Sequence, residues 1–287
     1  MFETQKENDM SGSSRKVWLI TGANSGFGRA LVEEAVAAGD VVVAAVRSTE
    51  SMRELVAQYP DQVDPVQLDV TDQSRIATVV EDVTRRHGRI DVLVNNAGRT
   101  HVGAVEETTD ADLRSLFELH FFGPAALVRA VLPHMRARRS GAIVQLSSMG
   151  GQMSFAGFSA YSATKFALEG LSEALADEAR AFGIKVLIVE PGAFRTGLFS
   201  ANSTSAASDI YADSVGKTRA MIESGHGTQP GDPAKAAAAI HRALNAERTP
   251  LRLPLGSDAF DAVAAHLDAV RGDLTAWESV ARDTTFA

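Results

Sequence analysis

The sequence predicts an α/β protein with one doubly wound domain, in which helices cover both faces of a parallel sheet in three α/β/α layers. Short apolar runs alternate with helix-length segments along most of the chain. The runs are continuously apolar, which is typical of parallel strands buried on both faces. Regular alternation of strand and helix implies right-handed crossovers. At 287 residues, 45% of them hydrophobic, the chain can form one such domain with a helical C-terminal extension.

The predicted elements follow in chain order. Strands are expected at seven apolar runs, namely 17–20, 41–46, 65–68, 90–96, 142–148, 185–190 and 251–255. The last run contains Pro254 and fits the edge of a sheet, because proline lacks the N–H that a central strand needs. Helices are expected at six longer segments, namely 26–38, 50–58, 72–87, 110–138, 159–182 and 232–245.

Three regions are expected along the chain. Residues 1–14 are polar and lack the apolar core of a signal peptide, so they predict a mobile tail. Residues 15–256 form the catalytic domain, in which a Ser- and Ala-rich stretch and a short helix make a substrate loop at 197–225. Residues 257–287 predict one or two amphipathic helices that extend the same domain.

Composition and charge exclude several classes of function. A net charge of −8 with no long basic run argues against a nucleic-acid surface. We find no stretch that approaches the ~20 apolar residues of a membrane span. Without cysteine, disulfides and thiolate ligands are excluded, and the seven histidines show no metal-ligand spacing. We therefore expect a cytoplasmic protein that acts on a small molecule without a metal.

A glycine-rich turn links the first strand to the first helix in "LITGANSGFGRAL". Gly22, Gly26 and Gly28 permit a tight turn and close approach of the backbone to a phosphate. The helix N-terminus then offers free N–H groups and positive partial charge to a pyrophosphate. The spacing G-x-x-x-G-x-G differs from the commoner G-x-G-x-x-G, yet its position predicts a dinucleotide-binding turn.

The end of the second strand bears on the choice of cofactor. An acidic residue there would bind the ribose hydroxyls of NAD, whereas an arginine accommodates the extra phosphate of NADP. The run "VVVAAVRSTE" places Arg47 at this point and has no carboxylate before Glu50. This favours NADP over NAD, although Arg47 could also be an ordinary surface charge.

Tyr161 and Lys165 open the helix expected at 159–182 and stand four residues apart, hence on one helix face. A phenol could exchange a proton with a reacting oxygen, and a neighbouring ammonium is expected to lower its pKa from about 10 to roughly 7. Ser148 ends the fifth strand, where its hydroxyl could donate to a developing oxyanion. The alternative is a packed ring and a solvated amine.

These motifs together resemble the short-chain dehydrogenase/reductase family, from about Val17 to Thr196. "TGANSGFG" is similar to the family's T-G-x-x-x-G-x-G loop, and "NNAG" at 95–98 to its motif after the fourth strand. "SS" at 147–148 with "YSATK" at 161–165 resembles its catalytic Ser and Y-x-x-x-K, and "EPGAFRT" at 190–196 its P-G-x-x-x-T segment. The resemblance implies a Rossmann-type fold and an NAD(P)-dependent oxidoreductase.

The resemblance also implies roles for individual residues. Ser148, Tyr161 and Lys165 would be catalytic. The residues that would contact the cofactor are Gly22, Asn24, Ser25, Gly26, Phe27, Gly28, Arg47, Asp69, Val70, Asn95, Ala97, Gly98, Tyr161, Lys165, Pro191, Gly192, Phe194 and Thr196. Phe27 is similar to the branch of retinol-type and 17β-hydroxysteroid-type enzymes, or it simply packs against the first helix.

One position departs from the family pattern. Aligning Gly123 with the family's glycine puts His120 where the family usually has an asparagine that holds a proton-relay water. An imidazole could do similar work, because it both donates and accepts and titrates near neutrality. Alternatively, His120 is only a spacer in the helix.

The substrate end is expected to have an apolar wall that suits a lipophilic ketone or aldehyde, made by Met149, Met153, Phe155, Phe158, Leu198 and Phe199. By analogy with the family, the helices at 110–138 and 159–182 would form a homodimer or homotetramer. Three hypotheses follow: an NADP-dependent carbonyl reductase, an NAD-preferring secondary-alcohol dehydrogenase, or a non-catalytic nucleotide-sensing protein.

Overall fold

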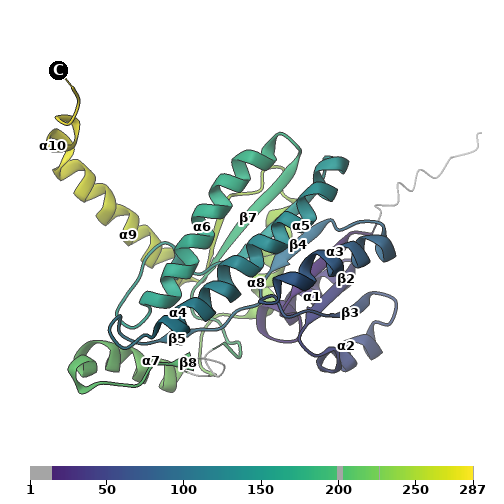
Figure 1. The fold of residues 1–287 in the computed structure, drawn as a ribbon, viewed down its shortest axis with the longest axis horizontal. Helices are drawn as coiled ribbons and strands as arrows, with labels where there is room; N and C mark the ends of the chain where they lie inside the picture. The colour runs from purple at the N-terminus through teal and green to yellow at the C-terminus, as the bar shows by residue number, and fades with distance from the viewer. Residues whose placement is uncertain (1–14, 199–202, 226, 287) are drawn as a thin grey trace, which may run out of the picture.

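Seven parallel strands form the central sheet of the computed structural model, which describes residues 15–198, 203–225 and 227–286 (Figure 1). The strands, in their order across the sheet, are β3 (Val63–Gln67), β2 (Val41–Val46), β1 (Val17–Thr21), β4 (Val92–Asn95), β6 (Gly141–Leu146), β7 (Ile184–Pro191) and β9 (Arg252–Leu255). Every neighbouring pair is parallel. The predicted fold class is confirmed, and the Pro254-containing strand lies at the sheet edge as predicted.

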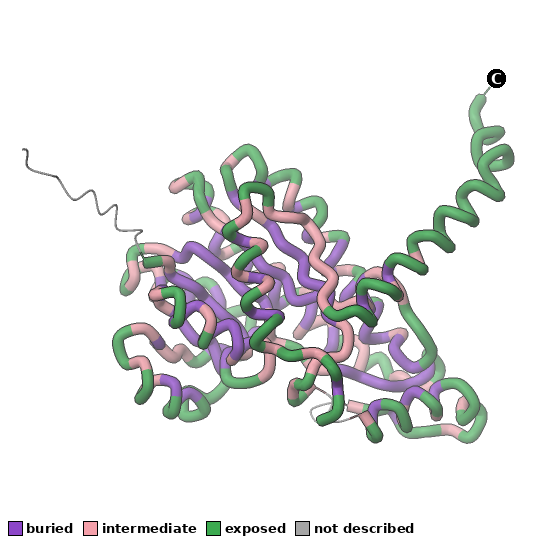
Figure 2. The backbone as a smooth tube through the Cα atoms, turned by 180° about the vertical axis from the view of Figure 1, so that it is seen from behind, coloured by how far each residue is buried: buried purple, intermediate pink, exposed green. Residues whose placement is uncertain are grey.

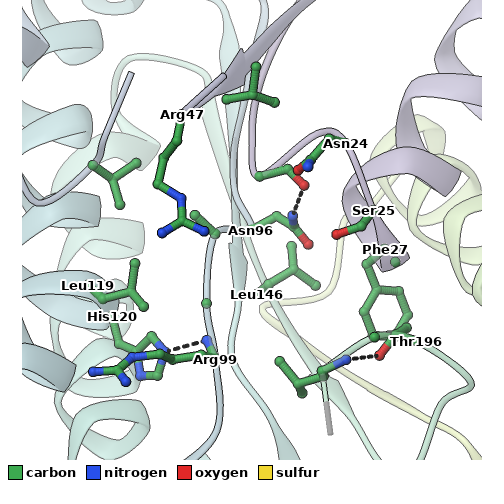
Figure 3. A pocket seen from close by; sticks show the side chains of 18 of the residues that line it. Asn24, Ser25, Phe27, Arg47, Asn96, Arg99, Leu119, His120, Leu146 and Thr196 are labelled. Atoms are coloured by element: carbon green, nitrogen blue, oxygen red, sulfur yellow. Dashed lines mark hydrogen bonds between the residues drawn. The ribbon is translucent and has the colours of Figure 1, made fainter. Parts of the chain in front are cut away.

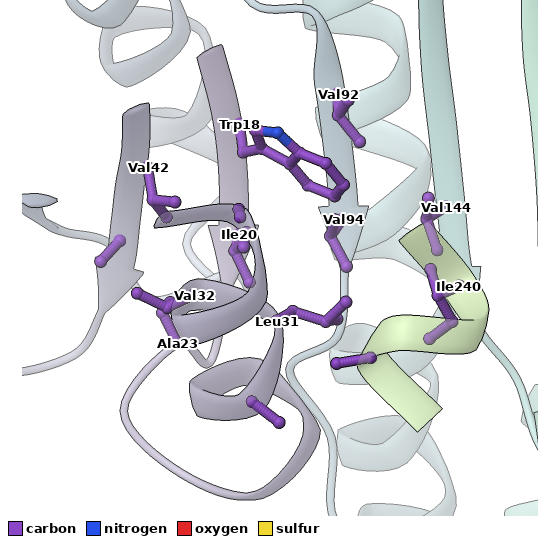
Figure 4. Close-up of a cluster of buried hydrophobic side chains, with 14 of the residues drawn as sticks. Trp18, Ile20, Ala23, Leu31, Val32, Val42, Val92, Val94, Val144 and Ile240 are labelled. Carbon is purple, nitrogen blue, oxygen red and sulfur yellow. The ribbon is translucent and has the colours of Figure 1, made fainter. Parts of the chain in front are cut away.

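Helices cover both faces of this sheet. One face carries α1 (Gly26–Ala37) and α8 (Pro233–Asn245), and the other carries α3 (Gln73–His87), α5 (Gly123–Arg138) and α6 (Ser159–Arg180). Successive side chains of β1 serve the two layers in turn: Trp18 and Ile20 pack with α1 and α8, whereas Leu19 packs on the opposite face. Figure 4 shows the first layer, where Leu31 of α1 and Ile240 of α8 meet the strands.

The strand order fixes where a ligand can bind. From β1 the chain proceeds to β2 and β3 on one side, and β4 with the later strands lies on the other. The crossover loops therefore separate at the carboxyl ends of β1 and β4, which opens a crevice at that edge. The glycine turn follows β1, the "NNAG" motif begins at the last residue of β4, and the serine pair follows β6.

The long helix predicted at 110–138 is interrupted. It consists of α4 (Asp110–Phe117), a π-helical turn (Glu118–Phe122) and α5. The Gly123 N–H bonds to the Glu118 carbonyl, five residues back. Our expectation that no segment is apolar enough to span a membrane needs correction here, because 110–138 meets that criterion by length and hydropathy. Leu127 and Val131 nevertheless pack fully buried against the sheet, as in the core helix of a globular domain.

The substrate loop contains structure that the sequence did not reveal. β5 (His101–Val102) pairs with β8 (Ser203–Thr204) in a separate two-stranded sheet, and two-residue strands are too short for a periodic pattern. A 3-10 turn (Asp209–Tyr211) and a π turn (Ala212–Gly216) lead into α7 (Lys217–Gly225). Val215 and Ile222 pack in one cluster with Phe158 and Tyr161.

The remaining elements are short or terminal. A 3-10 turn (Thr49–Met52) leads into α2 (Arg53–Gln58), and another (Met149–Gly151) follows the serine pair. The expected C-terminal helices are α9 (Ser257–Ala276) and α10 (Glu278–Arg282), which project away from the body in both views (Figures 1 and 2). The predicted tail at 1–14 lies outside the described residues.

Candidate active site

A cavity of about 760 Å³ runs along the carboxyl edge of the sheet, from the end of β2 past the glycine turn to the start of α6 (Figure 3). Most of the predicted site residues line it, namely Gly22, Asn24, Ser25, Gly26, Phe27, Arg47, Asp69, Val70, Ala97, Gly98, His120, Ser148, Tyr161, Lys165, Pro191, Gly192, Phe194, Thr196 and Leu198. In Figure 3 Arg47 and His120 lie along one side, and Ser25, Phe27 and Thr196 along the other.

The glycine turn has the conformation that a phosphate site requires. Gly22 and Gly26 have φ of +63° and +52°, a backbone conformation that residues other than glycine rarely adopt. A Cβ at Gly26 would approach Thr196 to 3.1 Å across the cavity. The turn is thus a cradle with backbone exposed at the start of α1, and these residues fit the pyrophosphate of a dinucleotide.

Gly28 does not line the cavity, contrary to the role implied by the family. A Cβ there would lie 2.2 Å from the Gly22 carbonyl oxygen, so the missing side chain lets α1 pack directly on the turn. Gly28 therefore shapes the cradle from behind, through the close approach of its backbone to Gly22.

Asn95 also lies outside the cavity. Its side-chain amide is buried and donates to Gln145 Oε1 at 2.9 Å, which ties β4 to β6. The neighbouring Asn96 lines the cavity and donates to the carbonyl oxygens of Thr21, at 2.8 Å, and Gly22, at 3.2 Å. Neighbouring strand residues face opposite sides, so alternation along β4 is the signal that could have separated the two asparagines.

Ser148, Tyr161 and Lys165 meet at the end of the cavity away from Arg47. Tyr161 and Lys165 stand in the first turns of α6, and both are buried. The Lys165 ammonium donates to the Leu146 carbonyl oxygen at 2.8 Å and lies 5.6 Å from the centroid of the Tyr161 ring. A Cβ at Gly150 would be 3.4 Å from both Ser148 Oγ and Tyr161 Cε1, which places the hydroxyl beside the ring.

The expected lowering of the Tyr161 pKa is wrong for the protein without its cofactor. Burial raises the pKa of Tyr161 to about 12, and a hydrogen bond with Ser148 opposes this rise. Desolvation disfavours the phenolate, and the Lys165 ammonium is directed to a backbone carbonyl. At neutral pH the phenol is therefore fully protonated and serves as a proton donor.

The pKa of Lys165 changes in the opposite direction from that of Tyr161, and burial is again the cause. Burial lowers its pKa to about 8, and the charge of Glu169 one turn further along α6 opposes this. Glu169 is itself buried against Arg252, with 3.0 Å between Oε2 and Nε. Lys165 thus carries a proton at neutral pH that it can release more readily than an exposed lysine.

His120 is held as a neutral imidazole. Thr164 Oγ1 donates to the Tyr161 carbonyl oxygen at 2.7 Å, so His120 Nδ1 donates to that hydroxyl, at 2.9 Å. Nε2 then accepts from the Arg99 N–H at 3.2 Å. Burial, together with the charges of Lys165 and Arg99, places the pKa of His120 well below its usual range. Both nitrogens are engaged, so the geometry gives His120 a positioning role and argues against the expected proton relay.

Most of the predicted substrate wall lies outside this cavity. Met149, Met153, Phe155 and Phe158 do not line the cavity, and Phe199 lies outside the described residues. Phe158 instead packs behind the Tyr161 ring, with centroids 6.0 Å apart. Only Leu198 of the predicted wall lines the cavity.

Three residues that the sequence did not single out line this part of the cavity, namely Arg99, Ser115 and Leu119. The Arg99 guanidinium donates to Ser115 Oγ at 2.8 Å and to Ser203 Oγ at 3.0 Å. Arg99 directly follows "NNAG", but a lone arginine after a motif carries no signal of its own.

The far end of the cavity is charged. Arg47 and Asp69 line both the main cavity and a smaller one of about 260 Å³, which Arg75 also lines. Asp69 accepts from the backbone N–H and the hydroxyl of Thr71, and these bonds, with the charge of Arg47, lower its pKa. The carboxylate is thus already bonded within its own loop, while the Arg47 guanidinium points into the cavity (Figure 3).

Comparison with known proteins agrees with this geometry. Residues 16–207 match the family model for short chain dehydrogenases, so the chain belongs to the short-chain dehydrogenase/reductase family and is an NAD(P)-dependent oxidoreductase. The 3-ketodihydrosphingosine reductase of Bacteroides thetaiotaomicron is 36% identical over 84% of this chain and 88% of its own.

Two solved structures have the same fold. A short-chain dehydrogenase from Streptomyces avermitilis is 62% identical, with a TM-score of 0.91 over 95% of this chain and 99% of its own. ElxO, solved with NADP bound, is 26% identical, with a TM-score of 0.72 over 86% of this chain and 99% of its own.

The contact at Gly28 gives a testable prediction. In Gly28→Ala the new methyl group must displace the Gly22 carbonyl, because 2.2 Å is far inside van der Waals contact. We expect NADPH affinity, measured by calorimetry, to fall by at least about tenfold, or roughly 1.4 kcal/mol. Gly170→Ala is the matched control, since a Cβ at that α6 position meets nothing within 4 Å. Unchanged affinity in Gly28→Ala would contradict the packing role.

The two candidate relay groups make different predictions for pH dependence. Lys165, with a pKa of about 8, loses its charge as pH rises, so kcat/KM should decline on the alkaline side with a limb near pH 8. His120→Gln should leave that limb in place, because the imidazole is already neutral at lower pH. A shift of the limb in His120→Gln would show that His120 titrates in the working range.

Proposed function

We propose that this protein is a carbonyl reductase that uses NADPH to reduce a lipophilic ketone or aldehyde. One observation carries the proposal. A single cavity holds Arg47 at one end, the glycine cradle along its wall, and Ser148, Tyr161 and Lys165 at the other end. The order of these groups along the carboxyl edge of the sheet suits a dinucleotide whose reactive ring lies beside Tyr161.

The residues divide the chemistry between them. The bound cofactor would supply the hydride that adds to the carbonyl carbon. Ser148 is placed to donate a hydrogen bond to the carbonyl oxygen, a contact that strengthens as negative charge develops. Tyr161 gives that oxygen a proton, and its pKa of about 12 lies below the pKa of the alcohol that forms, so transfer to the alkoxide is downhill. The product is the alcohol.

Lys165 completes the cycle. The phenolate left on Tyr161 is a much stronger base than the Lys165 amine, whose pKa is about 8. A proton can therefore pass from the ammonium to the phenolate, and solvent can restore it. The hydrogen bond to the Leu146 carbonyl keeps the ammonium beside the ring meanwhile.

The preference for NADPH rests on Arg47. Its guanidinium stands just beyond the end of β2 and lines both cavities at the charged end. Arg75 adds a second positive charge to the smaller cavity, which the carboxylates of Asp69 and Asp72 also line. A 2′-phosphate would form charge-assisted hydrogen bonds with such groups. Solved relatives bind either cofactor, NADP in ElxO and NADH in a 3-ketoacyl-(acyl-carrier-protein) reductase from Brucella melitensis, so the preference rests on Arg47 alone.

The preference for a lipophilic substrate rests on Leu119, Phe194 and Leu198, which line the reaction end. A relative is named 3-ketodihydrosphingosine reductase, and that name supports a ketone as the group that is reduced. Arg99 and Ser115 add one polar patch to the same end.

A homo-oligomer is part of the proposal. Phe122 on the π turn and Phe166 on α6 are 41% and 47% exposed, on elements that lie against each other in the fold. Exposed aromatic side chains on neighbouring helices suit a helical interface between two copies.

Removing the Tyr161 hydroxyl tests the catalytic assignment. Tyr161→Phe keeps the ring and its packing but removes the proton donor, so kcat should fall by about 10²–10⁴-fold while NADPH still binds. Tyr59→Phe is the control, because that hydroxyl bonds to Gln58 near α2, away from the cavity. Turnover by Tyr161→Phe at the wild-type rate, measured with NADPH and a panel of ketones, would refute the proposed chemistry. Tight NADPH binding by the wild type without any turnover would instead favour a nucleotide sensor.

Reversing the charge at position 47 tests cofactor choice. Arg47→Asp should lower kcat/KM for NADPH by about 10–100-fold, since a charged hydrogen bond contributes roughly 1.5–3 kcal/mol, and should leave NADH equal or improved. Arg53→Asp changes a neighbouring charge that is 78% exposed and outside the cavity, and should alter neither value. Equal losses for both cofactors in Arg47→Asp would show that Arg47 does not recognise the 2′-phosphate, and a higher kcat/KM with NADH than with NADPH in the wild type would mean an NAD-preferring enzyme.

A further inference from the structure

The C-terminal arm, defined here as residues 257–286, is an exposed helical segment with an apolar stripe. Ala259 and Val263 are buried at its base, and residues 267–286 are exposed along their whole length. Figures 1 and 2 show the arm extending away from the domain. Its apolar side chains include Leu274, 70% exposed, and Trp277, 65% exposed. Side chains of this size are seldom left open to water as a row on a monomer.

The apolar residues of the arm follow a heptad pattern, at Phe260, Val263, Leu267, Val270, Leu274 and Trp277. The steps between them alternate between three and four residues, an average of 3.5. That period makes a narrow seam that stays in contact with one other helix in a coiled coil. A helix that covers a broad protein surface would show a wider stripe.

The arm needs such a partner for its own stability. An isolated helix of this length is marginal in water, because its nucleation cost is recovered only through packing. Gly272 lies within α9 and weakens it further by about 1 kcal/mol relative to alanine.

We propose that the arm pairs with the arm of a second copy of this chain, as an antiparallel helical pair about a two-fold axis. The seam is its own complement, as a two-fold interface requires. The exposed part, 267–286, has its centre near Trp277. In the single chain Trp277 is the non-helical residue between α9 and α10, so the pair requires the two helices to continue as one through it. An antiparallel pair that then overlaps these parts sets Leu274 of each copy against Trp277 of the other and keeps the two domains apart.

Charges beside the seam favour the antiparallel direction. Arg271 follows Val270 and Glu278 follows Trp277, so both stand at the same heptad flank. In an antiparallel pair this flank faces itself, which sets Arg271 opposite Glu278 of the other copy. A parallel pair would instead bring Asp273, on the other flank, against Glu278. Flanking charges of this kind set helix direction in coiled coils.

Charge also argues against a membrane as the partner. Between 257 and 283 the arm has six acidic residues and two arginines. Helices that lie on membranes carry lysine and arginine on their polar face to match anionic lipids. An acidic arm would be repelled by such a surface, whereas a second copy offers a matching seam and sets Arg271 opposite Glu278.

The seam is tested by assembly state in the full chain. Leu267→Asp/Leu274→Asp should halve the mass measured by light scattering at micromolar concentration, with the dissociation constant raised by at least about 30-fold. Ala265→Asp/Ala276→Asp adds the same charge to the arm away from the seam and should leave the mass unchanged. NADPH-dependent activity per protomer, or the circular dichroism spectrum if no substrate is found, shows that each variant is folded.

Trp277 reports the contact directly, because the chain has only one other tryptophan, Trp18, and that is 1% exposed. In a Trp18→Phe background, Trp277 emission should shift to shorter wavelength as protein concentration rises. A blue-shifted emission that does not depend on concentration would mean that the arm folds onto its own domain, and a shift only on adding phosphatidylserine vesicles would mean a membrane surface. Either result, or an unchanged mass in the seam variant, overturns the proposal.

The direction of pairing has its own test. Glu278→Arg should weaken association by roughly three- to tenfold, as expected for a pair of exposed charge contacts reversed to repulsion, and Arg271→Glu/Glu278→Arg should restore it. A parallel pair would respond in the opposite way, since Glu278→Arg would then face Asp273. Stronger association of Glu278→Arg would therefore refute the antiparallel arrangement.

Discussion

The hydrogen bond from the Lys165 ammonium to the Leu146 carbonyl oxygen, 2.8 Å long, is the contact on which the site depends. It joins the start of α6, which carries Tyr161, to the end of β6, which Ser148 follows by two residues. A buried ammonium is stable only when its donors are satisfied, so the bond fixes the distance between helix and strand. Thr164, the residue before Lys165 in α6, adds a second link through its hydrogen bond with His120 on the π turn. The reaction end is therefore rigid before any ligand binds.

Much of the fold could be predicted from the sequence because a parallel sheet imposes a simple pattern. Strands buried on both faces must be apolar throughout, and glycines mark the turns that leave them, so all seven strands and the edge position of β9 were predicted correctly. The π turn before Gly123 and the β5–β8 pair were not predicted. Both depend on contacts between distant segments, such as the close approach of Gly123 to the Val70 carbonyl, and leave no local period in the sequence.

The site was predicted where motif spacing fixes backbone position, and missed where side-chain direction decides. Asn95 and Asn96 are chemically identical, yet only one faces the cavity. Phe158 was assigned to the substrate wall because it is apolar and near Tyr161, whereas it supports the ring from behind. The pKa of Tyr161 was predicted in the wrong direction, because the prediction considered the charge of the nearby ammonium but not the desolvation of the buried phenol. In a buried site desolvation acts on every group, and a charge that is directed elsewhere does not offset it.

The pKa values of Tyr161 and Lys165 change in opposite directions from one cause, and both changes suit the proposed reduction of a carbonyl. Burial favours the neutral form of both groups, so it makes the phenol a weaker acid and the ammonium a stronger one. The ordinary pKa values, 10.0 for tyrosine and 10.5 for lysine, would make proton transfer from the ammonium to the phenolate slightly unfavourable. In this site the order is reversed, with about 12 for Tyr161 and about 8 for Lys165, so in the proposed reaction the return of the proton to Tyr161 is favourable. A more exposed site would reduce the difference between the pKa values of Tyr161 and Lys165. The hydrophobic packing of Phe158, Val215 and Ile222 around Tyr161 is thus part of the acid–base chemistry, because it keeps water from the ring.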